Sequence, residues 1–309
     1  MTDAPRVQYA RTRDGFSIAF TVTGSGPPLV YMPQPLLSAL QARPDIAACR
    51  AFDRRLEQAF QVIRYDSRGC GLSTRKIESL ELDALVSDVE AIVDQLQLEE
   101  YFIWAEFDGG PPAIALAHRH GERVKKLVLW CSWARSQDIL DKDAWLALNQ
   151  LIEQNLRLYL ETVTQGLVSG TGLDPRELVE SLMPSIDQKS LRIGIEGFWR
   201  LDTTELLSEM KCPCLIMHRQ GLFFPLEQST RLAAAIPNGR LIAFPGAGGF
   251  PWTGDTAAVV EALEAFLLPD GAPYTTSGPS ALRTVLFTDL VGHTAMMQRL
   301  GDEHGILLS

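Results

Sequence analysis

Short apolar runs alternate along this chain with longer amphipathic stretches, and this alternation restricts its fold more than any other feature. Residues 82–97 have the apolar spacing of a helix. Five runs read instead as strands: residues 16–24, 28–33, 60–69, 101–106 and 124–132. Strands that alternate with helices are typical of crossover units on a mainly parallel sheet, with helices on both faces. The pattern therefore predicts an α/β fold.

The alternation stops at residues 134 to about 210, where the apolar spacing is helical and no strand stands out. We interpret this segment as an inserted helical cap. Strand and helix patterns then resume at residues 212–221, 226–235, 240–246 and 255–268. Residues 269–280 are dense in Pro, Gly, Ser and Thr, which is typical of a linker. The chain is thus divided into residues 1–268, this linker, and residues 281–309.

Composition narrows the possible partners and the compartment. The 309 residues carry a net charge of −10 and no Lys/Arg-rich run, so we expect no nucleic-acid partner and no membrane partner. The N-terminus lacks a signal peptide's apolar core, and no apolar run approaches the roughly 18 residues of a membrane span. These observations predict a cytoplasmic protein. The five cysteines are scattered, so they are predicted to be buried reduced thiols rather than zinc ligands.

Three segments of residues 14–268 carry a resemblance to a known family. They are VIRYDSRGCGLST (62–74), GGPPAIALAHRHGERVKKLVLW (109–130) and IPNGRLIAFPGAGGFPW (236–252). In the order of their elements, and in the turn residues between these elements, they resemble the α/β-hydrolase family. The resemblance implies an α/β-hydrolase fold, with a mainly parallel central sheet, helices on both faces and an inserted helical cap. It also implies that residues 1–268 form one domain.

The same resemblance locates the positions of a Ser-His-acid hydrolase. AEFDGG (105–110) is similar to the family's G-x-S-x-G-G turn, which puts Phe107 at the nucleophile position. Leu222 stands at or next to the acid position, and Gly249 at the histidine position. Pro35 stands where a backbone N–H donor is usual, and proline has none. Since these residues cannot do acyl-transfer chemistry, the resemblance predicts a catalytically degenerate domain.

Two alternatives remain open. In one, the chain is an active hydrolase or dehalogenase that uses Asp108, or another non-standard residue, as its nucleophile. In the other, it is a purely structural dimerisation module. The histidines do not favour the first alternative, because none matches the family's base, and all are predicted to be structural or solvated: His118, His120, His218, His293 and His304.

A ligand pocket is predicted at the carboxyl ends of the strands, between sheet and cap. Its expected occupant is a small apolar or aromatic ligand, although the aromatic residues could instead fill a collapsed cavity. The turn at Phe107 is expected to have relaxed, or else the phenyl ring points into the space of a substrate carbonyl. The predicted lining is Pro33, Gln34, Pro35, Phe107, Asp108, Trp130, Trp133, Phe223, Phe224, Phe250 and Trp252.

The segment RTVLFTDLVGHTAMMQRLGDEHG (283–305) resembles the opening of a class III nucleotide cyclase domain. The resemblance implies that Asp289 and the carbonyl of Leu290 help hold Mg²⁺ or Mn²⁺ in a complete cyclase domain. It also implies that the following turn binds phosphate through Gly292, His293 and Thr294. The match covers too little of such a domain to form an active site.

Together the two resemblances predict a degenerate, ligand-sensing regulatory domain of an adenylate cyclase, truncated before the cyclase site is complete. The full-length protein would convert ATP to cyclic AMP and pyrophosphate. A homodimer is expected through the cyclase domain. No cofactor is expected for residues 1–268.

Overall fold

The computed structural model describes residues 5–43, 46–139, 142–222, 225–268 and 283–285. These residues form one sheet of nine strands in the order β1-β2-β4-β3-β5-β6-β7-β8-β9. Neighbours from β4 to β8 run parallel, whereas β1–β2, β2–β4 and β8–β9 are antiparallel. The predicted mainly parallel sheet is therefore confirmed.

The strands β2 to β7 fall within the apolar runs of the sequence and β8 begins one residue before its run, whereas β1 was not predicted. Their bounds are β1 Gln8–Arg11, β2 Ser17–Thr23, β3 Pro28–Met32, β4 Gln61–Tyr65, β5 Tyr101–Glu106, β6 Val124–Trp130, β7 Cys214–Arg219, β8 Gly239–Phe244 and β9 Arg283–Val285. In β5 to β8 nearly every residue is buried or half-buried, as expected for strands covered on both faces. The pairing of β9 with β8 extends the sheet at that edge.

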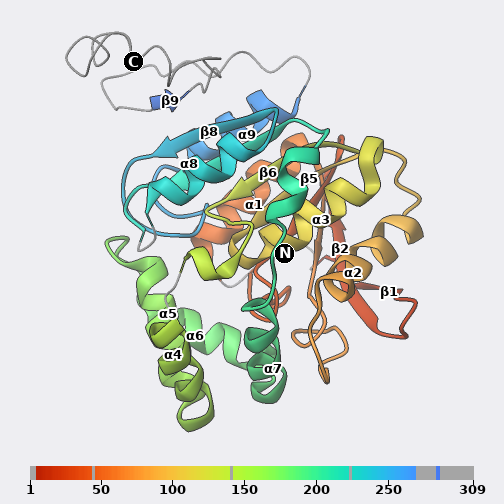
Figure 1. The fold of residues 1–309 in the computed structure, drawn as a ribbon. Coiled ribbons are helices and arrows are strands. Elements are labelled where there is room, and N and C mark those ends of the chain that lie inside the picture. The colour runs from red at the N-terminus through yellow and green to blue at the C-terminus, as the bar shows by residue number, and fades with distance from the viewer. Residues whose placement is uncertain (1–4, 44–45, 140–141, 223–224, 269–282, 286–309) are drawn as a thin grey trace, which may run out of the picture.

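Helices cover both faces of the sheet (Figure 1). The helices α1 (Ala47–Ala59) and α9 (Thr256–Leu267) share one apolar core with one face. The helices α2 (Leu82–Gln95), α3 (Gly110–His120) and α8 (Leu226–Ala235) share a second core with the other face. The sheet is thus the middle of three layers, which confirms the predicted architecture.

Four helices project from the sheet as the predicted cap (Figure 1). They are α4 Lys142–Gln154, α5 Leu156–Val168, α6 Pro175–Leu182 and α7 Gln188–Phe198. Asn155, Asp174 and Asp187 begin the last three, and each side chain accepts a hydrogen bond from a first-turn backbone N–H. Short 3-10 helices lie at Gly121–Arg123 (η3), Ser136–Asp138 (η4), Met183–Ser185 (η5) and Thr204–Glu209 (η6).

Features predicted beyond residue 268 are largely outside the described residues. This applies to the linker at 269–280 and to the proposed metal and phosphate positions Asp289, Leu290, Gly292, His293 and Thr294. The boundary of a second domain at 281 therefore stays a prediction.

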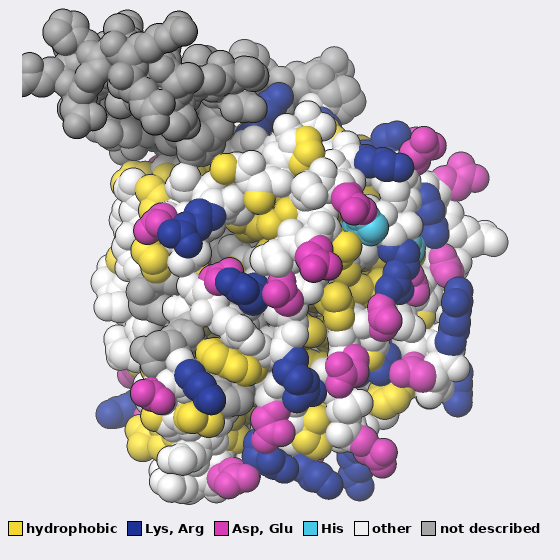
Figure 2. Space-filling model, in the orientation of Figure 1, with side chains coloured by type: hydrophobic (Ala, Val, Ile, Leu, Met, Phe, Trp, Pro, Cys, Tyr) yellow, Lys and Arg dark blue, Asp and Glu magenta, His cyan; other side chains and the backbone are white. Residues whose placement is uncertain are grey.

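The surface charge, the cysteines and the helix lengths can each be compared with the sequence analysis. On the face in Figure 2, basic and acidic side chains are interspersed rather than gathered by sign. All five cysteines are free and buried, as predicted. Within the described ranges, no helix is both long and apolar enough to span a membrane.

The loop after β4 holds the loop after β3 in place. The Asp66 carboxylate accepts hydrogen bonds from the backbone N–H groups of Leu40 and Leu72, both at 2.9 Å. The Ser67 hydroxyl accepts one from the N–H of Leu36 at 2.8 Å. Arg68 ties the loop after β4 to α2, because its Nη2 donates to the Asp88 carboxylate at 2.7 Å. The β3 loop, which carries Gln34, is therefore held by these polar contacts together with the apolar packing of the buried Leu36.

Asp88→Asn is expected to lower the free energy of unfolding by about 3 kcal/mol, because the buried Arg68 guanidinium loses its buried partner and keeps only the half-exposed Asp14 carboxylate. Asp83→Asn, on the same helix, removes only an exposed pair with Arg119 and is expected to cost less than about 1 kcal/mol. Urea unfolding of both variants measures the difference. Equal losses would show that the Arg68–Asp88 pair does not anchor the loop.

Candidate functional site

The candidate site lies where β5 turns into α3. Phe107 opens a short 3-10 helix, η2 (Phe107–Gly109), and its φ of 48° is in the left-handed region that few non-glycine residues adopt. Two glycines allow the tight turn that follows. A Cβ on Gly109 would lie 2.8 Å from the carbonyl oxygen of Pro33, and one on Gly110 would lie 1.7 Å from Ser132 Oγ. The turn therefore packs closely against the residues that follow β3 and β6.

The expectation that this turn has relaxed is wrong, since Phe107 keeps the strained backbone that a sharp strand-to-helix turn requires. The ring lies close to Gly249 and Leu222, and the expectation that it fills the space of a substrate carbonyl stays a prediction. A Cβ on Gly249 would lie 3.4 Å from Phe107 Cζ and 3.1 Å from Leu222 Cδ2. The structure thus brings together the three residues that the sequence assigned to nucleophile, acid and base. Their assignment to those roles stays a prediction.

Two cavities adjoin Phe107. The larger, which we call the cap cavity, has a volume of about 310 Å³ and includes Gln34, Asp108, Trp133 and Tyr159 in its lining. The smaller, which we call the inner cavity, has a volume of about 100 Å³ and includes Tyr31, Arg43, Glu106, Phe250 and Trp252. The aromatic residues therefore line real cavities, and the alternative of a collapsed one is wrong.

Most residues of the predicted pocket line one or both cavities. Pro33, Phe250 and Trp252 line the inner cavity, Pro35, Asp108 and Trp133 line the cap cavity, and Gln34 and Phe107 line both. Trp130 is a correction, because it is fully buried beneath the site, where its indole N–H donates to the Gly249 carbonyl at 2.6 Å. Phe223 and Phe224 lie outside the described residues.

Asp108 is the carboxylate of the cap cavity. It follows Phe107, the residue with the positive φ, and does not itself adopt that backbone conformation, while its role as a nucleophile stays a prediction. The Gln34 side-chain amide donates to Asp108 Oδ2 at 3.2 Å. Burial raises the pKa of Asp108 to about 6, although the hydrogen bonds from Gln34 and Trp133 oppose the rise.

Glu106 is the carboxylate of the inner cavity, and sequence reasoning missed it. It shares the α1–α9 face of the sheet with Trp104, two residues earlier in β5, and is only 5% exposed. Its carboxylate accepts a hydrogen bond from the Tyr31 hydroxyl. Burial raises the pKa of Glu106 to about 7, against the lowering effect of Arg43 and of the Tyr31 hydrogen bond.

The guanidinium groups near Glu106 already have carboxylate partners. Arg43 donates to both oxygens of Asp53, through Nε at 3.1 Å and Nη2 at 2.6 Å. Arg64 pairs with Asp53 at 3.1 Å and with Glu57 at 2.9 Å. No Lys, Arg or His of the described ranges lies within ion-pair distance of Glu106. Glu106 is therefore the surplus carboxylate of this buried cluster.

The described histidines have structural partners. His118 pairs with Glu209 at 2.9 Å near the surface, His120 contacts the Tyr101 hydroxyl at 2.7 Å, and His218 contacts Ser229 at 2.9 Å. His293 and His304 lie outside the described residues. Among the residues that the structure describes, no group of three or more His, Cys, Asp or Glu side chains could hold a metal ion.

Comparison with known proteins identifies this arrangement. The family model described as the alpha/beta hydrolase fold matches residues 40–173. An enol-lactonase from Burkholderia xenovorans LB400 superposes with a TM-score of 0.71 at 20% identity, over 84% of this chain and 99% of that one. An esterase from Exiguobacterium antarcticum gives a TM-score of 0.73 at 20% identity, with the same coverage of 84% and 99%.

The chain has the α/β-hydrolase fold. Among curated proteins, this α/β-hydrolase-fold chain is 28% identical over 223 residues to a putative carbamate hydrolase, RutD, of Caulobacter sp. (strain K31). That match covers 69% of this chain and 81% of the relative. A bifunctional esterase/perhydrolase of Acinetobacter calcoaceticus is 26% identical over 208 residues, with coverage of 62% and 75%.

These relatives overturn the function predicted from the sequence. Both the carbamate hydrolase and the esterase/perhydrolase are named for hydrolytic reactions, and neither match points to a nucleotide cyclase. The prediction of a catalytically degenerate regulatory domain of an adenylate cyclase, with cyclic AMP signalling, is therefore wrong. The alternative of an active hydrolase agrees better with the relatives.

The raised pKa of Glu106 makes stability depend on pH. The folded protein holds this proton up to about pH 7, whereas an unfolded glutamate loses it near its ordinary value of 4.5. The folded state therefore loses relative stability as pH rises through this window. Glu106→Gln stays neutral, so from pH 5 to pH 8 it should gain up to about 3 kcal/mol relative to the unchanged protein.

Urea unfolding at both pH values measures this gain. Glu100→Gln, an exposed position just before β5, controls for the substitution itself. Equal changes for Glu106→Gln and the unchanged protein between pH 5 and pH 8 would contradict the prediction.

Proposed function

We propose that the chain is a hydrolase of small carbonyl compounds of the ester, lactone or carbamate type, with Asp108 and Gln34 of the cap cavity as its reactive pair. The observation that carries this proposal is a carboxylate with a pKa of about 6, held by an amide donor in a largely apolar cavity between sheet and cap. Such a cavity at the carboxyl ends of the strands is the usual ligand site of this kind of fold. The hydrolase relatives support the reaction class.

Asp108 acts as a general base in this mechanism. A carboxylate with a pKa near 6 is ionised at neutral pH and is still basic enough to accept a proton from water. The resulting hydroxide attacks the carbonyl carbon of the substrate and forms a tetrahedral oxyanion. Collapse of this intermediate breaks the bond to the leaving group, which takes the proton back from Asp108. One water is consumed, and an acid and an alcohol or amine are released.

Gln34 serves as the electrophilic donor. A side-chain amide has two N–H groups, and one of them holds Asp108 at 3.2 Å. The second is available to the substrate carbonyl oxygen and would stabilise the oxyanion as it forms. This role suits the β3 loop, where Pro35 has no backbone N–H to offer. Phe107 lines both cavities and forms one wall of the substrate site.

Asp108→Asn is expected to lower kcat by about 100-fold or more with little change in KM, because the amide cannot accept the proton. Turnover of p-nitrophenyl acetate, a small lactone and an aryl carbamate measures the effect. Asp143→Asn, an exposed aspartate on the cap helix α4, is the matched control and should keep full activity. Absence of turnover of all three substrates by the unchanged protein would reject the proposed function.

A labelling experiment separates a base from a nucleophile. In a single turnover in ¹⁸O water, a base puts the label into the product acid at once. A nucleophilic Asp108 would instead put it into its own side chain, which mass spectrometry of the peptide would detect. The activity should also fall below about pH 6 as Asp108 becomes protonated.

A further inference from the structure

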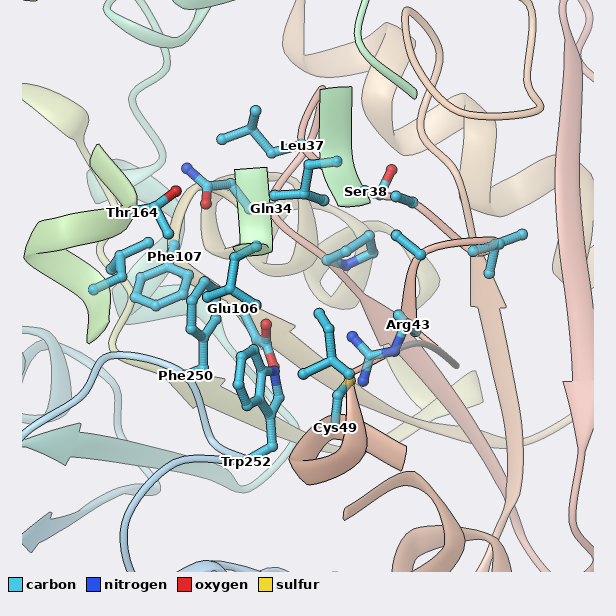
Figure 3. Close-up of a pocket in the computed structure, with 18 of the residues that line it drawn as sticks. Gln34, Leu37, Ser38, Arg43, Cys49, Glu106, Phe107, Thr164, Phe250 and Trp252 are labelled. Carbon is cyan, nitrogen blue, oxygen red and sulfur yellow. The ribbon is translucent and has the colours of Figure 1, made fainter. Parts of the chain in front are cut away.

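The inner cavity contains a charge arrangement that the proposed hydrolysis does not use. Glu106 lies between two different walls (Figure 3). Phe107, Phe250 and Trp252 follow one another along one wall, and Arg43 and Cys49 lie on the other side. Its carboxylate has the Tyr31 hydroxyl as a donor and no cationic side chain of the described ranges in ion-pair contact.

The charge of the cluster favours a cation. Two guanidiniums, Arg43 and Arg64, face the three carboxylates of Asp53, Glu57 and Glu106. Arg43 donates two hydrogen bonds to Asp53, through Nε and Nη2. The negative charge of Asp53 therefore offsets the repulsion that Arg43 would exert on a cationic ligand. When Glu106 ionises, the cluster carries one uncompensated negative charge in a buried environment. Such a charge is costly unless a cation pairs with it.

The aromatic wall adds a second attraction for a cation. Phe250 and Trp252 stack with ring centroids 4.6 Å apart and planes 9° apart, and the rings of Phe107 and Phe250 are nearly perpendicular with centroids 6.1 Å apart. Aromatic faces attract ammonium groups, and their apolar surface suits short alkyl chains. A volume of about 100 Å³ limits the occupant to a few non-hydrogen atoms.

We propose that the inner cavity binds a small protonated alkylamine, with the ammonium group on the Glu106 carboxylate and the alkyl part against Phe250 and Trp252. The two carboxylates belong to different cavities, since Glu106 lines the inner cavity only and Asp108 the cap cavity only, whereas Gln34 and Phe107 line both. Amine binding at Glu106 is therefore measured without relying on turnover by Asp108. The proposal assigns to Glu106 a ligand-binding role in addition to its contact with Tyr31.

Propylammonium chloride is the probe, tested with the full chain at pH 8 by isothermal titration calorimetry and by thermal unfolding. Propan-1-ol and sodium propionate have similar size but no positive charge, and sodium chloride controls for ionic strength. Propylammonium is expected to bind with a dissociation constant of roughly the millimolar range and to raise the Tm. The alcohol and the carboxylate are expected to bind at least about tenfold more weakly.

Variants locate the binding. Glu106→Gln should weaken propylammonium binding by about tenfold or more, because it removes the charge and keeps the shape. Phe250→Leu should weaken it several-fold through loss of an aromatic face, and it serves as a second test if Glu106→Gln folds poorly. Asp108→Asn should bind as tightly as the unchanged protein. Equal binding of propan-1-ol, or unchanged binding in a folded Glu106→Gln, would overturn the proposal; if Glu106→Gln does not fold, unchanged binding in Phe250→Leu would do so.

Discussion

The site depends on one steric constraint, the close approach of the α3 N-terminus to the ends of the neighbouring strands. Gly109 lies against the carbonyl oxygens of Met32 and Pro33, at distances of 2.9 and 2.8 Å from a Cβ placed on it, and neither contact can rotate away. A Cβ on Gly110 would meet the Ser132 side chain at 1.7 Å and the backbone carbonyl oxygen of Trp133 at 3.0 Å, both after β6. Because three strand ends are drawn together at this point, residues from separate loops can face one cavity. This approach brings Gln34 to Asp108, although 74 positions separate them in the chain.

Much of the fold could be predicted because each element carries a local signal. The strand Tyr101–Glu106 and the helix Leu226–Ala235 have the bounds that their apolar spacing indicates, since burial on both faces or on one face dictates that spacing. Some of the site could also be predicted. Gln34, Asp108 and Phe250 were assigned to a pocket because they follow strands, and loops after parallel strands meet at one edge of the sheet.

The rest depends on contacts that local patterns do not encode. Glu106 is the one charged residue of an otherwise apolar strand, which could have indicated a buried carboxylate. Its surroundings, however, are set by Arg43 and Tyr31 from distant segments. Trp130 was misplaced for a similar reason. The sequence shows that it ends a strand, but the face on which its ring lies and its bond to Gly249 depend on the register between strands. The predicted function is wrong for a different reason. The side chains of Phe107, Leu222 and Gly249 do not decide whether other residues of the cavity are reactive.

Gly249 has a consequence for how this site could change. A Cβ there would lie 2.7 Å from Leu167 on α5, 3.1 Å from Leu222 and 3.4 Å from Phe107, so the three neighbours already fill the space that a larger side chain would need. A larger side chain at this position would have to push aside the ends of these three side chains, which come from the cap helix α5, the loop after β7 and the turn after β5. Gly249 thus links the packing of the cap to that of the turn, so that one substitution here would be felt in both.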